Sequence, residues 1–143
     1  MPSDLALKTM NRVHRVVLTL SFGKLGWRAG GMPALELTTV GRRSGEPRAS
    51  MLTSPVQEGD ALVIVASRGG DAAHPAWYLN LQAHPEVTVR YGGGRARAMR
   101  ARTVEGAERD RLWKAIVSSQ PRYAGYQSKT ERVIPVVVLD PIA

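Results

Sequence analysis

Residues 36–52 read Glu-Leu-Thr-Thr-Val-Gly-Arg-Arg-Ser-Gly-Glu-Pro-Arg-Ala-Ser-Met-Leu, and this stretch has the pattern of a β-hairpin. Apolar and β-branched residues alternate with others over residues 35–40, which predicts a strand. Gly41 and Gly45 interrupt the run, as turn residues do, and residues 49–56 predict the returning strand.

Three arginines surround the predicted turn, namely Arg42, Arg43 and Arg48. Glycines at a turn can adopt positive φ and expose backbone N–H groups that bind anions. Guanidinium groups bind phosphate and carboxylate through paired hydrogen bonds. The turn could therefore grip an anion, or it could be a solvated basic hairpin tip, and these residues alone leave both interpretations open.

The composition is that of one folded domain, expected to span residues 1–143. Hydrophobic residues make up 43% of the 143 residues, which is enough for one core. There is no cysteine, so disulfides, thiolate nucleophiles and thiolate metal ligands are excluded. The apolar run at residues 16–20 is too short to cross a bilayer and no signal peptide is visible, so a cytoplasmic location is expected.

The formal net charge is +8, which points to an anionic partner. Nucleic acid, an anionic membrane surface and a polyanionic small molecule all fit such a charge. No nucleic-acid-binding motif occurs and aromatic residues make up only 6% of the chain, so no specific nucleic-acid partner is expected. Residues 3–24 predict an amphipathic helix, which could dock on the domain or touch a membrane, and residues 30–33 predict a connector to the sheet.

The apolar run at residues 61–66 predicts a strand buried on both faces, after a tight turn at residues 57–60. It leads into Ser67-Arg68-Gly69-Gly70, a second candidate anion grip. Residues 76–83 predict a helix carrying Trp77 and Asn80. Core packing with Asn80 on the surface is one interpretation of this helix, and the residues alone leave it open. His74 and His84 flank this helix and are interpreted as structural, because no metal-ligand spacing surrounds them and no metal is expected.

The remaining segments alternate between strands and helices. Residues 87–91 and 95–104 predict two strands, with a bulge near Ala98 or Met99 where the phase of the arginines changes. Residues 106–119 predict a helix, and residues 122–129 predict a short helix or a loop. Residues 133–139 predict a final strand whose Pro135 marks an edge or a bulge. The order predicts an α+β fold, mostly antiparallel, with a barrel as one arrangement.

No motif in the chain supplies catalytic chemistry by itself. Catalytic-triad, dinucleotide-binding and Walker patterns are absent. Any reaction would have to come from a bound cofactor, and the chain offers apolar residues for a flat ring and arginines for an anionic tail. The residues alone lead only to a candidate binder of an anionic cofactor.

The order of motifs resembles the deazaflavin-dependent nitroreductase family, the class A oxidoreductases that use coenzyme F-420. The resemblance covers the chain from about residue 35 to its end, and the motifs become specific through their shared order and spacing. The matching segments are residues 37–48, 65–70, 74–81, 84–87, 126–130 and 132–136. The resemblance implies a split β-barrel at residues 35–143, preceded by the helix and connector at residues 1–30.

The resemblance also implies a pocket for coenzyme F-420. The turn at residues 42–48 would hold the phosphate and oligoglutamate tail, and residues 49–53 would line the ring. Residues 65–68 would wrap the other side of the ring, and residues 76–80 would close the pocket. Tyr126 would border the place where the acceptor meets the ring. The implied cofactor-binding residues are Arg42, Arg43, Ser44, Arg48, Ala49, Ser50, Met51, Leu52, Thr53, Val65, Ala66, Ser67, Arg68, Ala76, Trp77, Tyr78, Leu79, Asn80 and Tyr126.

The implied reaction is hydride transfer from the reduced deazaflavin to an activated alkene, a quinone or a nitro compound. Ser67 and Tyr126 are the implied catalytic residues, as hydrogen-bond or proton donors. Thr53 and Lys129 stand where nitroimidazole-reducing members carry tyrosines, which argues against that activity. Barrels of this type often form homodimers. An FMN-binding barrel and a non-enzymatic basic binding module are the alternatives.

Overall fold

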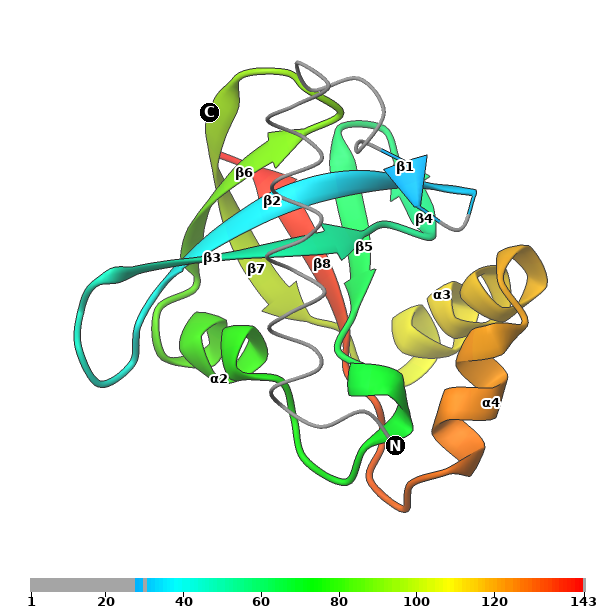
Figure 1. The fold of residues 1–143 in the computed structure, drawn as a ribbon. Coiled ribbons are helices and arrows are strands. Elements are labelled where there is room, and N and C mark those ends of the chain that lie inside the picture. Colours follow the sequence, from blue (N-terminus) through cyan, green and yellow to red (C-terminus); the bar gives the residue numbers. More distant parts are fainter. Residues whose placement is uncertain (1–27, 30, 143) are drawn as a thin grey trace.

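The computed structural model describes residues 28–29 and 31–142, and these form a curved antiparallel sheet with helices at its ends (Figure 1). The elements are β1 (Arg28–Ala29), β2 (Met32–Val40), β3 (Pro47–Thr53), β4 (Val56–Glu58), β5 (Ala61–Val65), the 3-10 turn η2 (Arg68–Gly70), α2 (Ala76–Ala83), β6 (Glu86–Tyr91), β7 (Ala96–Thr103), α3 (Gly106–Ser119), α4 (Arg122–Ser128) and β8 (Val136–Pro141).

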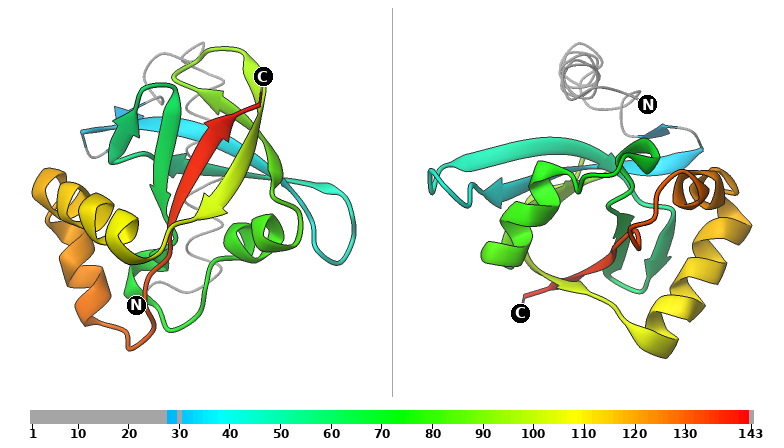
Figure 2. Two further views of the ribbon diagram at one scale, coloured as in Figure 1. Left: turned by 180° about the vertical axis from the view of Figure 1, so that it is seen from behind. Right: turned by 90° about the horizontal axis from the view of Figure 1, so that it is seen from below.

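The strands follow the order β1-β2-β6-β7-β8-β5-β4, with β3 paired on β2 outside this path. Every pairing is antiparallel. Figure 2 shows the sheet curling, with α2 apart from the pair formed by α3 and α4. The structure therefore confirms the predicted α+β class and the split β-barrel.

Two apolar clusters hold the fold together, one on each face of the central strands. The first packs α2 against the inner face of the barrel, and Leu35, Ile64, Trp77 and Leu139 belong to it. The second packs α3 and α4 against the opposite face of β5 and β8, through Val63, Leu112, Ile116, Ile134 and Val138. Strands β5 and β8 are thus buried on both faces, as predicted for β5.

Several predicted boundaries are confirmed, among them α2 at residues 76–83 and α3 at residues 106–119. The predicted second strand of the hairpin is wrong beyond Thr53. Buried Ser54 donates its hydroxyl to the carbonyls of Val56 and Val63 (2.9 and 2.8 Å), and β4 then begins within the predicted strand. Gln57 and Glu58 therefore belong to β4 rather than to a turn.

Three further expectations need correction. Met32 and Pro33 lie in β2 and not in a connector. The last strand begins at Val136, since Pro135 before it has no amide hydrogen to donate, although its carbonyl still accepts from the Ala66 amide. The predicted bulge near Ala98 is absent, since β6 and β7 pair without a break from Glu86–Arg100 to Arg90–Ala96. Arg97 lies on β7 beyond Met99, which is the last β7 residue paired with β8. Arg97 is therefore exposed.

The predicted helix at residues 3–24 lies outside the described residues, and its contact with a membrane stays a prediction. No helix in the described ranges is long and apolar enough to span a bilayer.

Candidate functional site

The β2–β3 turn is fixed to α2 through a buried asparagine. The Asn80 side chain is 4% exposed, and its Oδ1 accepts hydrogen bonds from the backbone N and the Nη1 of Arg42, at 3.2 and 2.9 Å. Its Nδ2 donates to Thr39 Oγ1 at 3.1 Å. A surface position for Asn80 was one interpretation of the sequence, and the structure buries the residue, so it holds Arg42 in place from beneath the turn.

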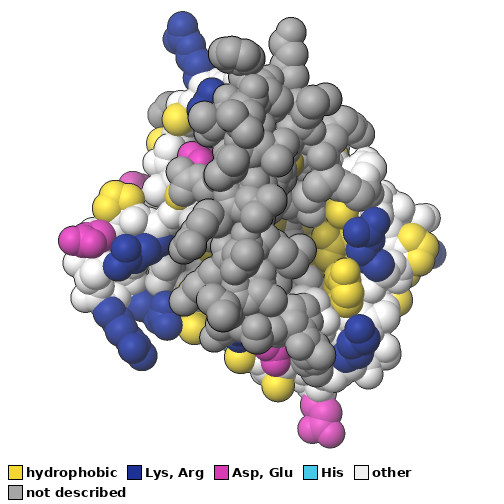
Figure 3. All heavy atoms as spheres, in the orientation of Figure 1, with side chains coloured by type: hydrophobic (Ala, Val, Ile, Leu, Met, Phe, Trp, Pro, Cys, Tyr) yellow, Lys and Arg dark blue, Asp and Glu magenta, His cyan; other side chains and the backbone are white. Residues whose placement is uncertain are grey.

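The rest of the turn presents positive charge to solvent. Arg42, Arg43, Ser44 and Arg48 are all exposed. Arg48 Nη2 donates to Ser44 Oγ at 3.4 Å and lies 3.9 Å from Glu46, with 57% of its side chain exposed. Lys and Arg side chains gather at the end of the molecule where Figure 1 draws this hairpin (Figure 3). The guanidinium groups are therefore available to an anion.

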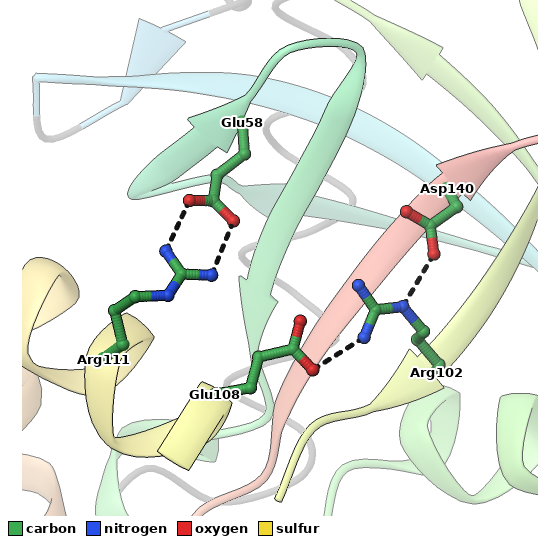
Figure 4. A network of polar contacts seen from close by, with 5 residues as sticks. All are labelled: Glu58, Arg102, Glu108, Arg111 and Asp140. Atoms are coloured by element: carbon green, nitrogen blue, oxygen red, sulfur yellow. Dashed lines mark hydrogen bonds and ion pairs between the residues drawn. The ribbon is translucent and has the colours of Figure 1, made fainter.

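Other arginines are already paired with carboxylates (Figure 4). Arg102 donates to Asp140 and Glu108, at 2.8 and 2.9 Å, and both carboxylates raise its pKa. Arg111 binds Glu58 through two hydrogen bonds, of 2.7 and 3.2 Å. Arg102 and Arg111 thus have closer carboxylate partners than Arg48, which lies 3.9 Å from Glu46.

The segment after β5 forms a tight loop. Arg68, Gly69 and Gly70 all have positive φ, at 47°, 64° and 83°. Arg68 forms an ion pair with Asp71 at 3.6 Å, and its side chain is 12% exposed. Ser67 is half-buried and Ala66 is buried, so the loop passes from the core to the surface within two residues.

The loop touches α4 at the residue implied to meet the acceptor. A Cβ atom on Gly70 would lie 2.7 Å from the backbone oxygen of Tyr126, so only glycine fits. Tyr126 is half-buried and packs edge-on against Tyr123, with ring centroids 5.6 Å apart. The structure therefore brings the Ser67 loop and Tyr126 together.

Strand β3 does not present one face to a ligand. Its register with β2 pairs Leu52 with Leu35 and Ser50 with Leu37, so these side chains share the inner face. Ala49, Met51 and Thr53 lie on the other face, where Met51 packs against Ala34. Residues 49–53 are thus divided between two faces, and a ring on one face would meet only part of the set.

Residues on α2 divide in the same way. Trp77 and Tyr78 are buried in the inner cluster, whereas Ala76 is exposed and Leu79 is half-buried. The Tyr78 hydroxyl lies 3.0 Å from Thr103 Oγ1 and accepts from Gln82 Nε2 at 3.1 Å. Its polar atom is therefore already used inside the fold.

A hollow of about 280 Å³ lies beside α2 and the start of α3. His74, Tyr78, Thr103, Glu105 and Arg109 are among its lining residues. Tyr78 is the one implied cofactor-binding residue among its lining residues, and Arg42, Ser67, Trp77 and Tyr126 do not line it.

His74 and Arg132 connect the loop to α2, and the sequence analysis assigned neither to the site. His74 Nδ1 lies 3.0 Å from Arg132 Nη1, and its ring lies 5.0 Å from that of Tyr78. Burial lowers the pKa of His74, and the nearby Arg132 lowers it further. No spacing in the sequence links residue 132 to residues 66–74, so nothing in the sequence could have predicted this contact.

The comparisons with known proteins agree with one another. A family model described as F420H(2)-dependent quinone reductase matches residues 10–141. An F420H(2)-dependent quinone reductase of Mycobacterium tuberculosis (strain ATCC 25618 / H37Rv) is 41% identical over 132 residues, covering 90% of this chain and 87% of that protein. A solved F420-H2 dependent reductase (FDR-A) gives a TM-score of 0.67 at 42% identity, covering 76% of this chain and 94% of that one. A structure described as a domain-swapped dimer gives 0.70 at 37% identity, covering 93% and 99%.

Proposed function

Because the chain belongs to the F420H(2)-dependent quinone reductase family, we propose that it seats coenzyme F-420 between the β2–β3 turn and the Ser67 loop. The protein is an F-420-dependent oxidoreductase, and a quinone is its small-molecule acceptor.

The observation that carries this proposal is that the arginines differ in their exposure and in their carboxylate partners. Arg42, Arg43 and Arg48 lie exposed on one turn, whereas Arg100 and Arg102 on β7 are paired with carboxylates. A phosphate with a chain of glutamates is a polyanion, and exposed guanidinium groups can bind it, since Arg48 has only a 3.9 Å pairing with exposed Glu46 and Arg42 donates to the neutral amide of Asn80. Asn80 supports the fit, because it fixes the Arg42 backbone before any ligand arrives.

When bound, reduced coenzyme F-420 supplies the hydride for reduction of the acceptor. The chain contributes placement, because two reacting atoms must approach within about 3–3.5 Å. Ser67 and Tyr126 stand on two segments that touch at Gly70, so their hydroxyls are the candidates to hydrogen-bond the charge that develops on the acceptor oxygen.

A fluorescence titration with F-420 tests the cofactor site. Arg42→Ala and Arg48→Ala should each weaken binding roughly 10- to 150-fold, since a hydrogen bond to a charged group contributes about 1.5–3 kcal/mol. Arg97→Ala is the matched control, because it removes the same charge from an exposed position on β7. Equal losses in all three variants would mean that only net charge matters. Failure of the unaltered protein to bind F-420 at micromolar concentration, or a bound yellow flavin, would refute the proposal.

We further propose that the chain forms a homodimer, supported by the 37% identical structure described as a domain-swapped dimer. Light scattering at several concentrations measures the mass directly. A monomeric mass throughout would contradict this part of the proposal and leave the cofactor site untouched.

A further inference from the structure

We propose that Arg132 is a positioning residue of the reductase site: its side chain fixes the Ser67 loop and its backbone fixes the helix that carries Tyr126. This inference rests on the proposed function, because it assigns the site to the space bordered by those two segments. Arg132 itself is placed behind the loop and is not assigned a contact with the cofactor or the acceptor.

The guanidinium group of Arg132 is used almost entirely by the backbone of the loop. Its Nε donates to the carbonyl of Asp71 at 2.8 Å, and its Nη2 donates to the carbonyl of Ser67 at 2.8 Å. Its Nη1 donates to the carbonyl of Ala66 at 3.2 Å and lies 3.0 Å from His74 Nδ1. One rigid fork of donors thus fixes both ends of residues 66–71, which a single ammonium group could not do.

The loop needs such support because of its backbone conformation. Arg68, Gly69 and Gly70 follow one another with positive φ, and Arg68 is the one non-glycine residue with positive φ in the described part of the chain. L-amino acids other than glycine avoid this region. The contacts of Arg132 lie on both sides of the strained residues, so they hold Ser67 and Arg68 in a geometry that the sequence does not favour by itself.

The backbone of Arg132 binds the opposite wall. Its carbonyl accepts a hydrogen bond of 2.7 Å from Nε2 of Gln127, the residue after Tyr126. Gln127 Oε1 in turn accepts from the Ile134 amide at 3.0 Å. Because Gly70 packs against the Tyr126 backbone, loop, helix and Arg132 form a closed set of contacts, and a shift of Arg132 would move both walls.

Arg132→Lys tests the inference, because it keeps the charge but loses the fork of donors. We expect kcat with a soluble quinone to fall about 10- to 100-fold, since a displacement near 1 Å can cost that much, and F-420 affinity to fall as well. KM for the quinone should change far less than kcat, and kcat is expressed per site titrated with saturating F-420, because an unfolded fraction would lower the apparent kcat without changing KM. Arg90→Lys is the matched control, since Arg90 Nε also donates to a backbone carbonyl, that of Gly94, at 3.1 Å, at the β6–β7 turn.

A second variant keeps the test decisive if Arg132→Lys does not fold. Gln127→Ala removes the hydrogen bonds of α4 to the Arg132 carbonyl and from the Ile134 amide, and it leaves the contacts of the guanidinium group with the loop in place. A fall in kcat with a native circular dichroism spectrum would support the inference. Wild-type kcat and F-420 affinity in a folded Arg132→Lys protein, or in Gln127→Ala, would overturn it. Failure of the unaltered protein to bind F-420 would instead refute the proposed function, so the two failures are distinguishable.

Discussion

Asn80 and Arg42 lie 38 residues apart and meet through two hydrogen bonds to one oxygen atom, at 2.9 and 3.2 Å. This contact joins the basic turn to the helix that fills the barrel. The conformation of an exposed anion-binding turn is therefore set from inside the core.

Asn80→Leu should destabilise the protein and weaken F-420 binding together. The substitution removes the acceptor of the Arg42 amide and one of two partners of buried Thr39 Oγ1, which keeps its 3.4 Å bond to the Arg48 carbonyl. We therefore expect a cost at the lower end of the range for an unsatisfied buried group, about 1 kcal/mol. Urea unfolding measures the loss of stability, and a fluorescence titration with F-420 measures the loss of affinity. Asn80→Asp keeps an accepting oxygen and serves as the comparison. Unchanged affinity in a destabilised Asn80→Leu protein would show that the turn orders itself.

Gly70→Ala should destabilise the protein more than Gly59→Ala does. Both glycines have positive φ, at 83° and 60°, and this conformation alone costs an alanine about 1–2 kcal/mol. A Cβ on Gly70 would also lie 2.7 Å from the Tyr126 oxygen, whereas nothing lies within 4 Å of a Cβ on Gly59. The difference between their free energies of unfolding in urea reports the clash, and equal values would mean that α4 moves freely.

Stability should fall on acidification as His74 takes up a proton. Its pKa is lowered in the folded state, so the unfolded chain binds the proton first, and stability is full above about pH 6.5 and is lost as the pH falls towards the folded pKa. Arg132 faces the ring, Tyr78 packs on it, and Glu105 and Arg109 line the same hollow.

Urea unfolding between about pH 7.5 and pH 5 measures this dependence. His74→Gln removes the titrating group and retains an oxygen that can accept from Arg132. Its stability should vary less over the same range. An identical slope in both proteins would assign the acid loss to carboxylates.

Arg102→Ala should cost more stability than Arg100→Ala. Arg102 bridges Asp140 on β8 and Glu108 on α3, whereas Arg100 has the single partner Glu86 (Figure 4 shows the first pair of contacts). These groups are partly exposed, so we expect a difference of only about 0.5–1 kcal/mol, and it should shrink in 1 M salt. Thermal unfolding at low and high salt measures it, and a salt-independent difference would indicate packing instead.

Local sequence patterns predicted most of the helices and strands, but few of the hydrogen bonds that hold the candidate site in place. Alternation and turn residues located β2, β5 and α2, because these signals arise from neighbouring residues. The break at Ser54 was missed because its hydroxyl is satisfied by Val63, which only the folded sheet brings near. The contacts of Asn80 and Arg132 were missed for the same reason, since they join residues 38 to 66 positions apart.

The position of β8 between β7 and β5 has a consequence for biosynthesis. In the described sheet, β8 alone connects the unit formed by β1, β2, β3, β6 and β7 to the β4–β5 hairpin. A nascent chain on the ribosome therefore exposes the apolar faces of both units until residues 136–141 have emerged. Chaperones that act on unfinished polypeptides would have the whole of that interval in which to bind it.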